Sequence, residues 1–509
     1  MYDQLRFDYL SCSGHPHLQT PNFDRVASMG VQFNNAYVQS PICGSSRMCF
    51  YTGRYASSHG AHWNGFPLRV GELTLGDHLR ANGMACHLIG KTHMKADADG
   101  LARLGLKADS IIGVRQSECG FDPWIRDDGL WAEGPDGFYD SKSSPYNNYL
   151  KSKGYDGTNP WADYANASVK NSQIATGWIF DNTNLPANIR EEDSETPWLT
   201  NEAIKFMDQN TGPWCAHLSY IKPHWPYIVP MPYASMFGSE HIQPATKALV
   251  EKEYPHPVFE QFMQNPIGQA FQDENVRQKV IPAYMGLIKQ CDDQLGRLLD
   301  YLEQNDKLDT TMIVLTSDHG DYLGDHWLGE KNLFHDPSVK IPLIIYDPSE
   351  AAGATRGTVC NELVESIDLA STFIDIIGGQ VPDHIVEGRS LVPFLIGEET
   401  EWRKYVISEY DFSAQPIAKT LELEPRDCRI FMVFDGRYKL MHCAASNLRS
   451  MLFDLQTDPD ELIDLAKDQS HEAEIARLTE YLHAWGLRMS QRVTKSDVDI
   501  KAMRGASLR

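Results

Sequence analysis

A cysteine and an arginine stand four residues apart in the segment PICGSSR, residues 41–47. Residues four apart lie on one face of a helix, so Arg47 could hold an oxygen-rich group at position 43 by charge-assisted hydrogen bonds. Taken alone, such a segment more often marks a buried cysteine at a helix start with a surface arginine. The chemical interpretation therefore depends on partners elsewhere in the chain.

Two further segments could supply those partners. In GKTH, residues 90–93, Lys91 and His93 alternate, so on an extended segment both face one side, where a cation and an imidazole suit an anion and a proton transfer. Asp318 and His319, together with Asp3, are hard-cation ligands if the fold brings them together. Taken alone, GKTH is better interpreted as a solvated turn after a strand, and the Asp318-His319 pair could also be a turn.

Two single residues complete the set of candidates. His224 lies in IKPHWP, residues 221–226, where the prolines on either side restrict the backbone. Lys331 follows the Asp318-His319 pair in the chain. Either residue, considered by itself, is an ordinary loop residue.

The secondary-structure pattern along the chain is that of an α/β protein. Thr20 to Gly30 has the cap, proline and glycine of a helix, and the apolar residues of 287–302 recur at helical spacing. Apolar strands at 312–315 and 342–346 follow, then a helix over 366–377. This order predicts an α/β fold with a large mixed, mostly parallel doubly wound sheet flanked by helices. Ligands bind beyond the carboxyl ends of such strands, where Asp318 and His319 would lie.

The remaining regions have a different character. Residues 95–190 are rich in Gly, Asp, Asn and aromatic residues, which predicts long loops and a lid. After residue 400, short strand candidates predict a small C-terminal antiparallel sheet with a helix at 471–490 packed on it. We expect a catalytic domain over 1–400, a small α+β subdomain over 401–490 and an extended C-terminal arm over 491–509.

Composition limits the functional classes. Forty-six basic against 69 acidic residues give a net charge of −23, which argues against nucleic acid and requires local positive charge around any anionic substrate. The ten cysteines form no CxxC pair, and no apolar run approaches the length of a membrane span. With no signal-peptide core at the N-terminus, we expect a cytoplasmic protein and no membrane partner.

In this order along the chain, the motifs resemble the sulfatase family of the alkaline-phosphatase-like superfamily, near its arylsulfatase, choline-sulfatase and phosphonate monoester hydrolase branches. The resemblance rests on five separated segments: Asp3-Gln4, Cys43 to Arg47 with TGR at 52–54, GKTH at 90–93, SDHG at 317–320, and the C-terminal LFDL at 452–455. It implies that a formylglycine-generating (sulfatase-maturating) enzyme oxidises Cys43 to formylglycine, whose hydrate attacks sulfur. Most members have Pro or Ala where this chain has Ser45.

The resemblance also implies a division of roles. One divalent ion, Ca²⁺ or Mn²⁺, would be bound by the modified Cys43 and four neighbours: Asp3, Gln4, Asp318 and His319. Substrate would be bound by Asn64, Lys91, His224 and Lys331. Catalysis would rest on Cys43 with Arg47, Lys91, His93, His224, Asp318 and Lys331. Many sulfatases have a second aspartate where this chain has Gln4, a pattern similar to the choline-sulfatase and phosphonate hydrolase branches.

Three functions follow in order of preference. A small-molecule sulfate monoester is the first expected substrate, because phosphonate monoester hydrolases replace the lysine and histidine of the GKTH motif with Tyr and Thr. Phosphonate monoesters and phosphodiesters are the alternative, and a non-catalytic binding protein with unmodified Cys43 is the third. The resemblance further implies a homo-oligomer, a dimer or tetramer, and a few apolar residues before Met1 in the natural chain.

Overall fold

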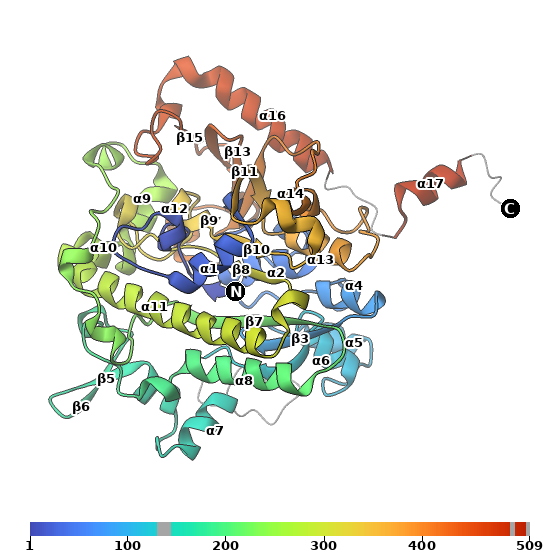
Figure 1. Ribbon diagram of the computed structural model, residues 1–509. Coiled ribbons are helices and arrows are strands. Elements are labelled where there is room, and N and C mark those ends of the chain that lie inside the picture. The colour runs from blue at the N-terminus through green and yellow to red at the C-terminus, as the bar shows by residue number, and fades with distance from the viewer. Residues whose placement is uncertain (130–143, 489–493, 505–509) are drawn as a thin grey trace.

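A mixed β-sheet forms the centre of the computed structural model, which describes residues 1–129, 144–488 and 494–504 (Figure 1). Two strand sets, β11-β2-β10-β8 and β1-β7-β3-β4, meet where Tyr2 bridges Ser317 in parallel. In this spatial order the strands are β11 (Thr358–Glu365), β2 (Val31–Tyr37), β10 (Leu343–Tyr346), β8 (Ile313–Thr316), β1 (Tyr2–Asp3), β7 (Trp214–Pro223), β3 (Ala85–Gly90) and β4 (Asp122–Arg126). The short β9 (Lys340–Ile341) pairs with β2.

Strand direction decides where the site can form. β1, β3, β4 and β7 run parallel to one another, and β10 runs antiparallel to both β2 and β8. Because the bridge between Tyr2 and Ser317 is also parallel, the carboxyl ends of β1, β3, β7 and β8 lie at one edge of the sheet. The predicted mixed, mostly parallel α/β sheet is confirmed.

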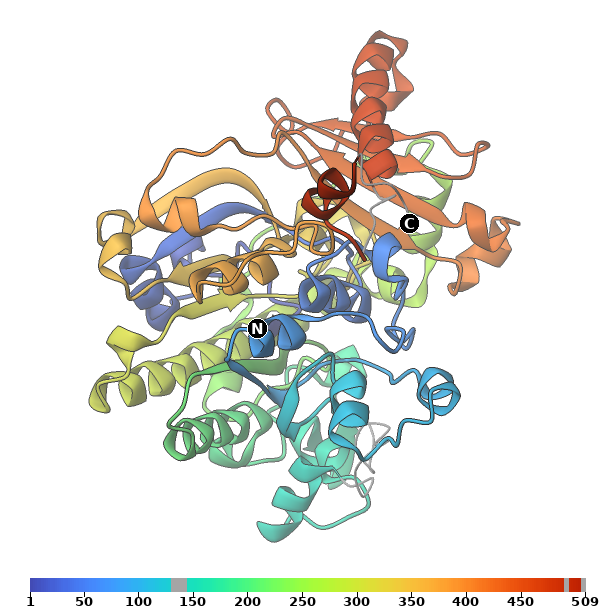
Figure 2. The same cartoon turned by 90° about the vertical axis from the view of Figure 1, so that its right-hand side faces the viewer.

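Helices cover both faces of this sheet (Figures 1 and 2). On one face α1 (Pro21–Met29), α8 (Glu195–Gln209) and α11 (Glu274–Gln304) pack on β10, β7 and β3. On the other face α2 (Cys43–Thr52), α4 (Leu75–Ala81) and α13 (Asp368–Ile376) pack together and against β3 and β11. Each helical layer contributes to its own hydrophobic core cluster, so the sheet is buried on both faces. The predicted helices at 20–30, 287–302 and 366–377 correspond to α1, α11 and α13.

Residues 95–190 contain more regular structure than the predicted long loops. The segment contains several short helices and strands. Residues 130–143, which belong to it, lie outside the described ranges. These elements are α5 (Ala98–Arg103), α6 (Ile111–Ser117), β4, α7 (Pro145–Ser152) and a hairpin of β5 (Ala167–Lys170) and β6 (Gln173–Thr176). The side chains of Asp97, Ser110 and Ser144 cap α5, α6 and α7. These capping residues are a local helix signal, which the prediction of loops from overall composition did not take into account.

The C-terminal strands form a separate antiparallel sheet, as predicted. Its order is β12 (Val406–Asp411), β13 (Arg429–Phe434), β14 (Tyr438–Cys443) and β15 (Met451–Asp454), with α16 (Glu472–Arg488) on one face. The face with Ile407 and Val433 packs on α16, and the face with Met432 and Met441 joins the core of the large sheet. The described part of the C-terminal arm includes the helix α17 (Asp497–Met503), which has no buried residue.

The remaining short α-helices of the described residues complete the fold. They are α3 (Ala56–His59), α9 (Pro257–Gln264), α10 (Pro266–Gln272), α12 (Asp336–Val339), α14 (Val392–Ile396) and α15 (Pro416–Thr420). Among the helices of the described residues, none combines the length and apolar character that crossing a bilayer requires.

An apolar cavity of about 740 Å³ lies at the amino ends of the central strands. Its walls include Met1, the beginnings of β7 and β8, and residues of α4, α8, α11 and α13 from both helical layers. It therefore lies within the plane of the sheet, at the end of the strands opposite to the predicted site.

Candidate active site

Cys43 is the first residue of α2 and is 1% exposed. Ile42 precedes it as an N-cap without a side-chain hydrogen bond, and the backbone N–H of Gly44 instead donates to Asn64 Oδ1 at 2.8 Å. A Cβ on residue 44 would lie 2.9 Å from this oxygen, so glycine allows the close approach. Asn64, predicted to bind substrate, thus contacts the helix start, where the helix dipole adds positive potential beside Cys43.

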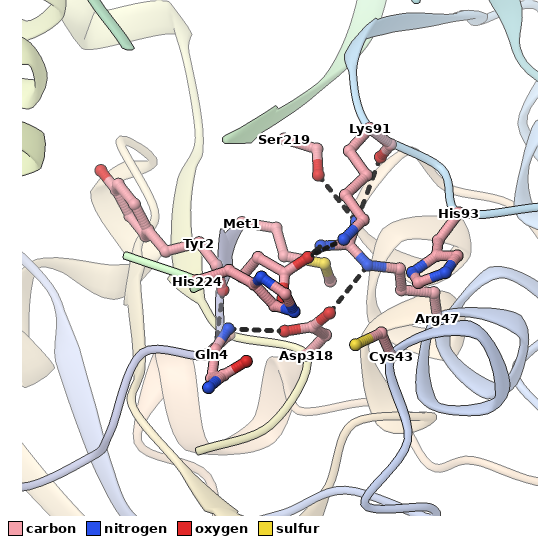
Figure 3. Close-up of polar contacts among 12 residues, drawn as sticks. Met1, Tyr2, Gln4, Cys43, Arg47, Lys91, His93, Ser219, His224 and Asp318 are labelled. Atoms are coloured by element: carbon pink, nitrogen blue, oxygen red, sulfur yellow. Dashed lines mark hydrogen bonds and ion pairs between the residues drawn. The ribbon is translucent and has the colours of Figure 1, made fainter. Parts of the chain in front are cut away.

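Arg47 lies one turn further along α2 and is fully buried. Its Nε donates to Asp318 Oδ2 at 2.8 Å and its Nη2 to Asp3 Oδ2 at 3.2 Å. The Nη1 group donates to Ser219 Oγ at 2.8 Å and to the carbonyl of Lys91 at 3.1 Å (Figure 3). The guanidinium therefore connects α2 to residues within or directly after four strands: β1, β3, β7 and β8.

Four candidate metal ligands converge at residue 43. Ligand atoms of Asp3, Cys43, Asp318 and His319 all lie within 4.8 Å of one another, and all four residues are buried. His319 Nδ1 is 2.8 Å from the carbonyl of Gly320, which leaves Nε2 facing Cys43 Sγ at 2.9 Å. Asp3 Oδ1 is buried and has no hydrogen-bond partner. Two carboxylates, a correctly directed imidazole and an orphaned oxygen fit a divalent cation.

Lys91 and His93 reach the same place from the end of β3. Lys91 Nζ is paired with Asp3 Oδ2; burial raises the pKa of Asp3, but Lys91, His224 and Arg47 outweigh it and hold that pKa below its ordinary value. The ring of His93 lies beside Cys43 (Figure 3). Its backbone has a φ of 57° and donates from N–H to Asp128 Oδ1 at 3.1 Å. Burial, then Lys91, lowers the pKa of His93, which favours a neutral imidazole.

Gln4 follows Asp3 and is also fully buried. Its backbone N–H donates to Asp318 Oδ1 at 3.0 Å. Its side-chain Nε2 donates to Tyr227 OH at 3.0 Å and to Asp321, and its Oε1 accepts from Lys331 Nζ at 3.3 Å.

Lys331 and His224 lie together on the remaining side of the site. Lys331 Nζ is 3.4 Å from His224 Nε2, and His224 Nδ1 contacts the carbonyl of Trp225. Burial alone would raise the pKa of the Cys43 thiol, but the charges of Lys331 and His319 hold it well below its ordinary value. The positive charges around residue 43 therefore favour a negatively charged group at that position.

Every residue that the sequence named for the site lies in this cluster or directly against it. Four polar neighbours were not anticipated: Asp128, Ser219, Tyr227 and Asp321. Asp321 follows Asp318 within SDHGD, residues 317–321, so its place in the same loop was the available signal. Nothing in the local sequence of Ser219 or Tyr227 indicates their contacts, because these join elements far apart in the chain.

Comparison with known proteins agrees with this geometry. A family model described as Sulfatase matches residues 1–379, and one described as N-sulphoglucosamine sulphohydrolase, C-terminal, matches residues 324–486. The multifunctional alkaline phosphatase superfamily protein PehA of Trinickia caryophylli is 30% identical, with 96% of this chain and 95% of that protein covered. An arylsulfatase of Clostridium perfringens is 26% identical, with 95% of this chain and 92% of that protein covered.

A solved structure is also similar over nearly the whole length. The phosphonate monoester hydrolase SpPMH from Silicibacter pomeroyi superposes with a TM-score of 0.83 at 28% identity, covering 97% of this chain and 95% of that chain. With the family match spanning the large sheet and its site, this chain belongs to the sulfatase family.

Proposed function

We propose that this chain hydrolyses sulfate monoesters, with formylglycine formed from Cys43 as the nucleophile and one divalent cation, Ca²⁺ or Mn²⁺. The family and its hydrolase relatives support a sulfuric ester or phosphonate ester hydrolase. The observation that carries the proposal is the concentration of positive charge around residue 43: Arg47, Lys91 and Lys331 are all buried there in a chain of net charge −23. Such a pocket is suited to a tetrahedral oxyanion.

The residues around position 43 suit both implied groups. Asp3, Asp318 and His319 would hold the cation, and Gln4 Oε1 is a neutral oxygen on the same side. When bound, the cation polarises the ester oxygens, and the hydrated aldehyde supplies one hydroxyl for attack and a second for release of sulfate. The maturating enzyme is accordingly a required partner.

Charge neutralisation and proton transfer are assigned to side chains of this chain. Lys91 and Lys331 neutralise the nonbridging oxygens of the sulfate group, and Arg47 fixes the positions of the Asp3 and Asp318 carboxylates. Asp318 draws the proton from the attacking hydroxyl. His224, beside Lys331, offsets charge on the leaving oxygen. His93, with its lowered pKa, accepts the proton of the second hydroxyl.

A specific observation also favours phosphonate monoesters and phosphodiesters as the second candidate. PehA and SpPMH are similar to this chain over nearly its full length. Sulfate esters rank first because Lys91 and His93 both lie at residue 43, where their charge and proton-accepting capacity act on the oxyanion. A binding protein with unmodified Cys43 is the third candidate, and the buried catalytic groups argue against it.

Parallel turnover of p-nitrophenyl sulfate and p-nitrophenyl phenylphosphonate separates the first two candidates. The enzyme is produced together with a formylglycine-generating enzyme, and the modified fraction is determined by mass spectrometry. We expect the higher kcat/KM for the sulfate and its preferential loss in Lys91→Met. A higher kcat/KM for the phosphonate would assign the second candidate. No turnover of either by fully modified, metal-loaded enzyme would contradict the hydrolase proposal.

We also propose a homo-oligomer, for which α17 offers an unburied helix with Val498 74% and Met503 52% exposed. Size-exclusion chromatography with light scattering tests this, and a monomer would contradict it.

A further inference from the structure

The orientation of the Gln4 carboxamide is determined by two residues outside the predicted site. Gln4 Nε2 donates both to Tyr227 OH and to Asp321 Oδ2. Tyr227 OH itself donates to Asp321, so the phenol oxygen is left as an acceptor toward Gln4. Both hydrogens of Gln4 Nε2 are therefore engaged in hydrogen bonds, one with Tyr227 and one with Asp321.

The opposite orientation of the amide would be costly. A flipped carboxamide would place Oε1 against the Asp321 carboxylate, which has no proton to donate when ionised. Asp321 Oδ1 is already occupied by the backbone N–H of Leu323 at 3.0 Å. Gln4, Tyr227 and Asp321 are all 0% exposed, so water could not compensate the lost hydrogen bonds. The amide therefore has one favourable orientation.

We propose that Tyr227 and Asp321 are positioning residues, which fix the Gln4 carboxamide so that its oxygen faces Lys331 and the cation ligands. The side-chain oxygen of Gln4 accepts from Lys331 Nζ at 3.3 Å and lies on the side of Asp318 and Cys43 (Figure 3). The Gln4 backbone N–H also contacts Asp318 Oδ1, so the residue is held at both ends. This inference rests on the proposed function, because it assumes a cation at Asp3, Asp318 and His319.

Gln4 would then offer the cation a hard oxygen ligand that carries no net charge. An oriented amide oxygen is a suitable ligand for Ca²⁺ or Mn²⁺. Outer partners that orient a metal ligand typically contribute about 10- to 100-fold in metal affinity. Tyr227 and Asp321 would act in this way through Gln4, without touching the cation.

Titration of the purified enzyme with CaCl₂ and, separately, MnCl₂ by isothermal calorimetry tests the proposal. For the ion that the unsubstituted enzyme binds more tightly, we expect Tyr227→Phe and Asp321→Asn each to weaken binding by about tenfold or more. In a Gln4→Ala background the same substitutions should have no further effect, because the residue through which they act is absent. Asp292→Asn removes a buried carboxylate on α11, away from the site, and should leave affinity unchanged.

The outcomes are separable. Unchanged affinity in both single variants, or an equal loss with and without Gln4, would overturn the positioning role. A purely structural contribution would give that equal loss, since it does not depend on the amide. Absence of cation binding by the unsubstituted enzyme, with Asp318→Asn behaving identically, would instead overturn the proposed metal-dependent function and this inference with it.

Discussion

Arg47 and Asp318 form a hydrogen-bonded ion pair at 2.8 Å in which both side chains are completely buried. Arg47 comes from α2, and Asp318 follows β8. The same guanidinium reaches Asp3 at the end of β1. This pair couples the helix that carries residue 43 to the residues proposed to bind the cation, so we expect stability and activity to depend on the same contact.

Arg47→Ala should lower the free energy of unfolding by about 3–5 kcal/mol, because it leaves the buried Asp318 carboxylate without its Arg47 partner and the buried Asp3 carboxylate with Lys91 alone. Arg47→Lys should recover part of this loss, since one ammonium cannot span both carboxylates as the guanidinium does. Urea denaturation of the metal-free protein measures both. Arg25→Ala, which removes surface ion pairs with Asp300 and Glu303, should cost about 1 kcal/mol or less. Equal losses for Arg25 and Arg47 would contradict the argument.

Cys43→Ala should reduce turnover by more than about a thousandfold, because the nucleophile is lost while the pocket remains. Cys49, also fully buried in α2, offers a matched control, and Cys49→Ala should retain activity. Mass spectrometry of the tryptic peptide containing residue 43 provides the independent measurement. An aldehyde mass lacking sulfur is expected in active enzyme, and an intact thiol in fully active protein would refute the proposed nucleophile.

Glu409 gives the protein a predictable pH dependence away from the site. This residue of β12 accepts from the N–H and hydroxyl of Ser57, yet burial raises its pKa to about 7. Between about pH 4.5 and 7 the folded state therefore binds more protons at Glu409 than the unfolded state, and stability falls as pH rises through this range. The total effect is about 3 kcal/mol.

Glu409→Gln should remove this slope and stabilise the protein at pH 8 relative to its parent. Chemical denaturation at a series of pH values compares the two proteins, with the exposed Glu399→Gln as control. A parallel slope in both variants would show that Glu409 is ionised without penalty in the folded protein.

The apolar cavity at the amino ends of β7 and β8 predicts that one more strand can be added in line with β1. The Met1 amine is buried beside it, donates to the carbonyl of Leu218 at 2.8 Å, and has a pKa lowered to about 5 by burial and then Arg47. Residues 214–219 of β7 pair with β3 on one edge. Within the described residues, β1 pairs with β7 only near Tyr220 and Pro223, so over 214–218 the opposite edge of β7 has no partner strand.

Six apolar β-forming residues joined to Met1 should therefore raise the melting temperature by about 5 °C or more, by filling the cavity and replacing the buried amine with an amide. A Gly-Ser extension of equal length is the control, because it also removes the amine but fills little volume. Hydrogen exchange at the amide of Ala216 should slow only with the apolar extension. Equal melting temperatures for both extensions would show that the cavity does not accept a strand.

Local sequence patterns were sufficient to predict the main helices, several strands and the chemical types of the site residues. Helical spacing at 287–302, the Thr20 to Gly30 boundaries of α1 and the apolar run before Asp318 are patterns within short contiguous segments, so they can be read without knowledge of the fold. The Thr20 side chain makes no cap hydrogen bond in the structure, where Asp292 accepts from the N–H groups of Asn22 and Phe23 instead. The motif around Cys43 and the Asp318-His319 pair identified the family for the same reason, since each is a short contiguous segment. Short capped helices within 95–190 were missed because a composition rich in polar and glycine residues masked their caps.

The way in which these segments meet depends on long-range contacts that appear only in the folded chain. The placement of β1 between β7 and β8 brings Asp3 to Asp318 across 315 residues, and no periodicity in the sequence specifies that neighbour. The contacts of Tyr227 and Asp321 with Gln4 likewise join the ends of different strands. Burial then gives these contacts their effect, because the same charges and amides would be solvated and weakly coupled at the surface.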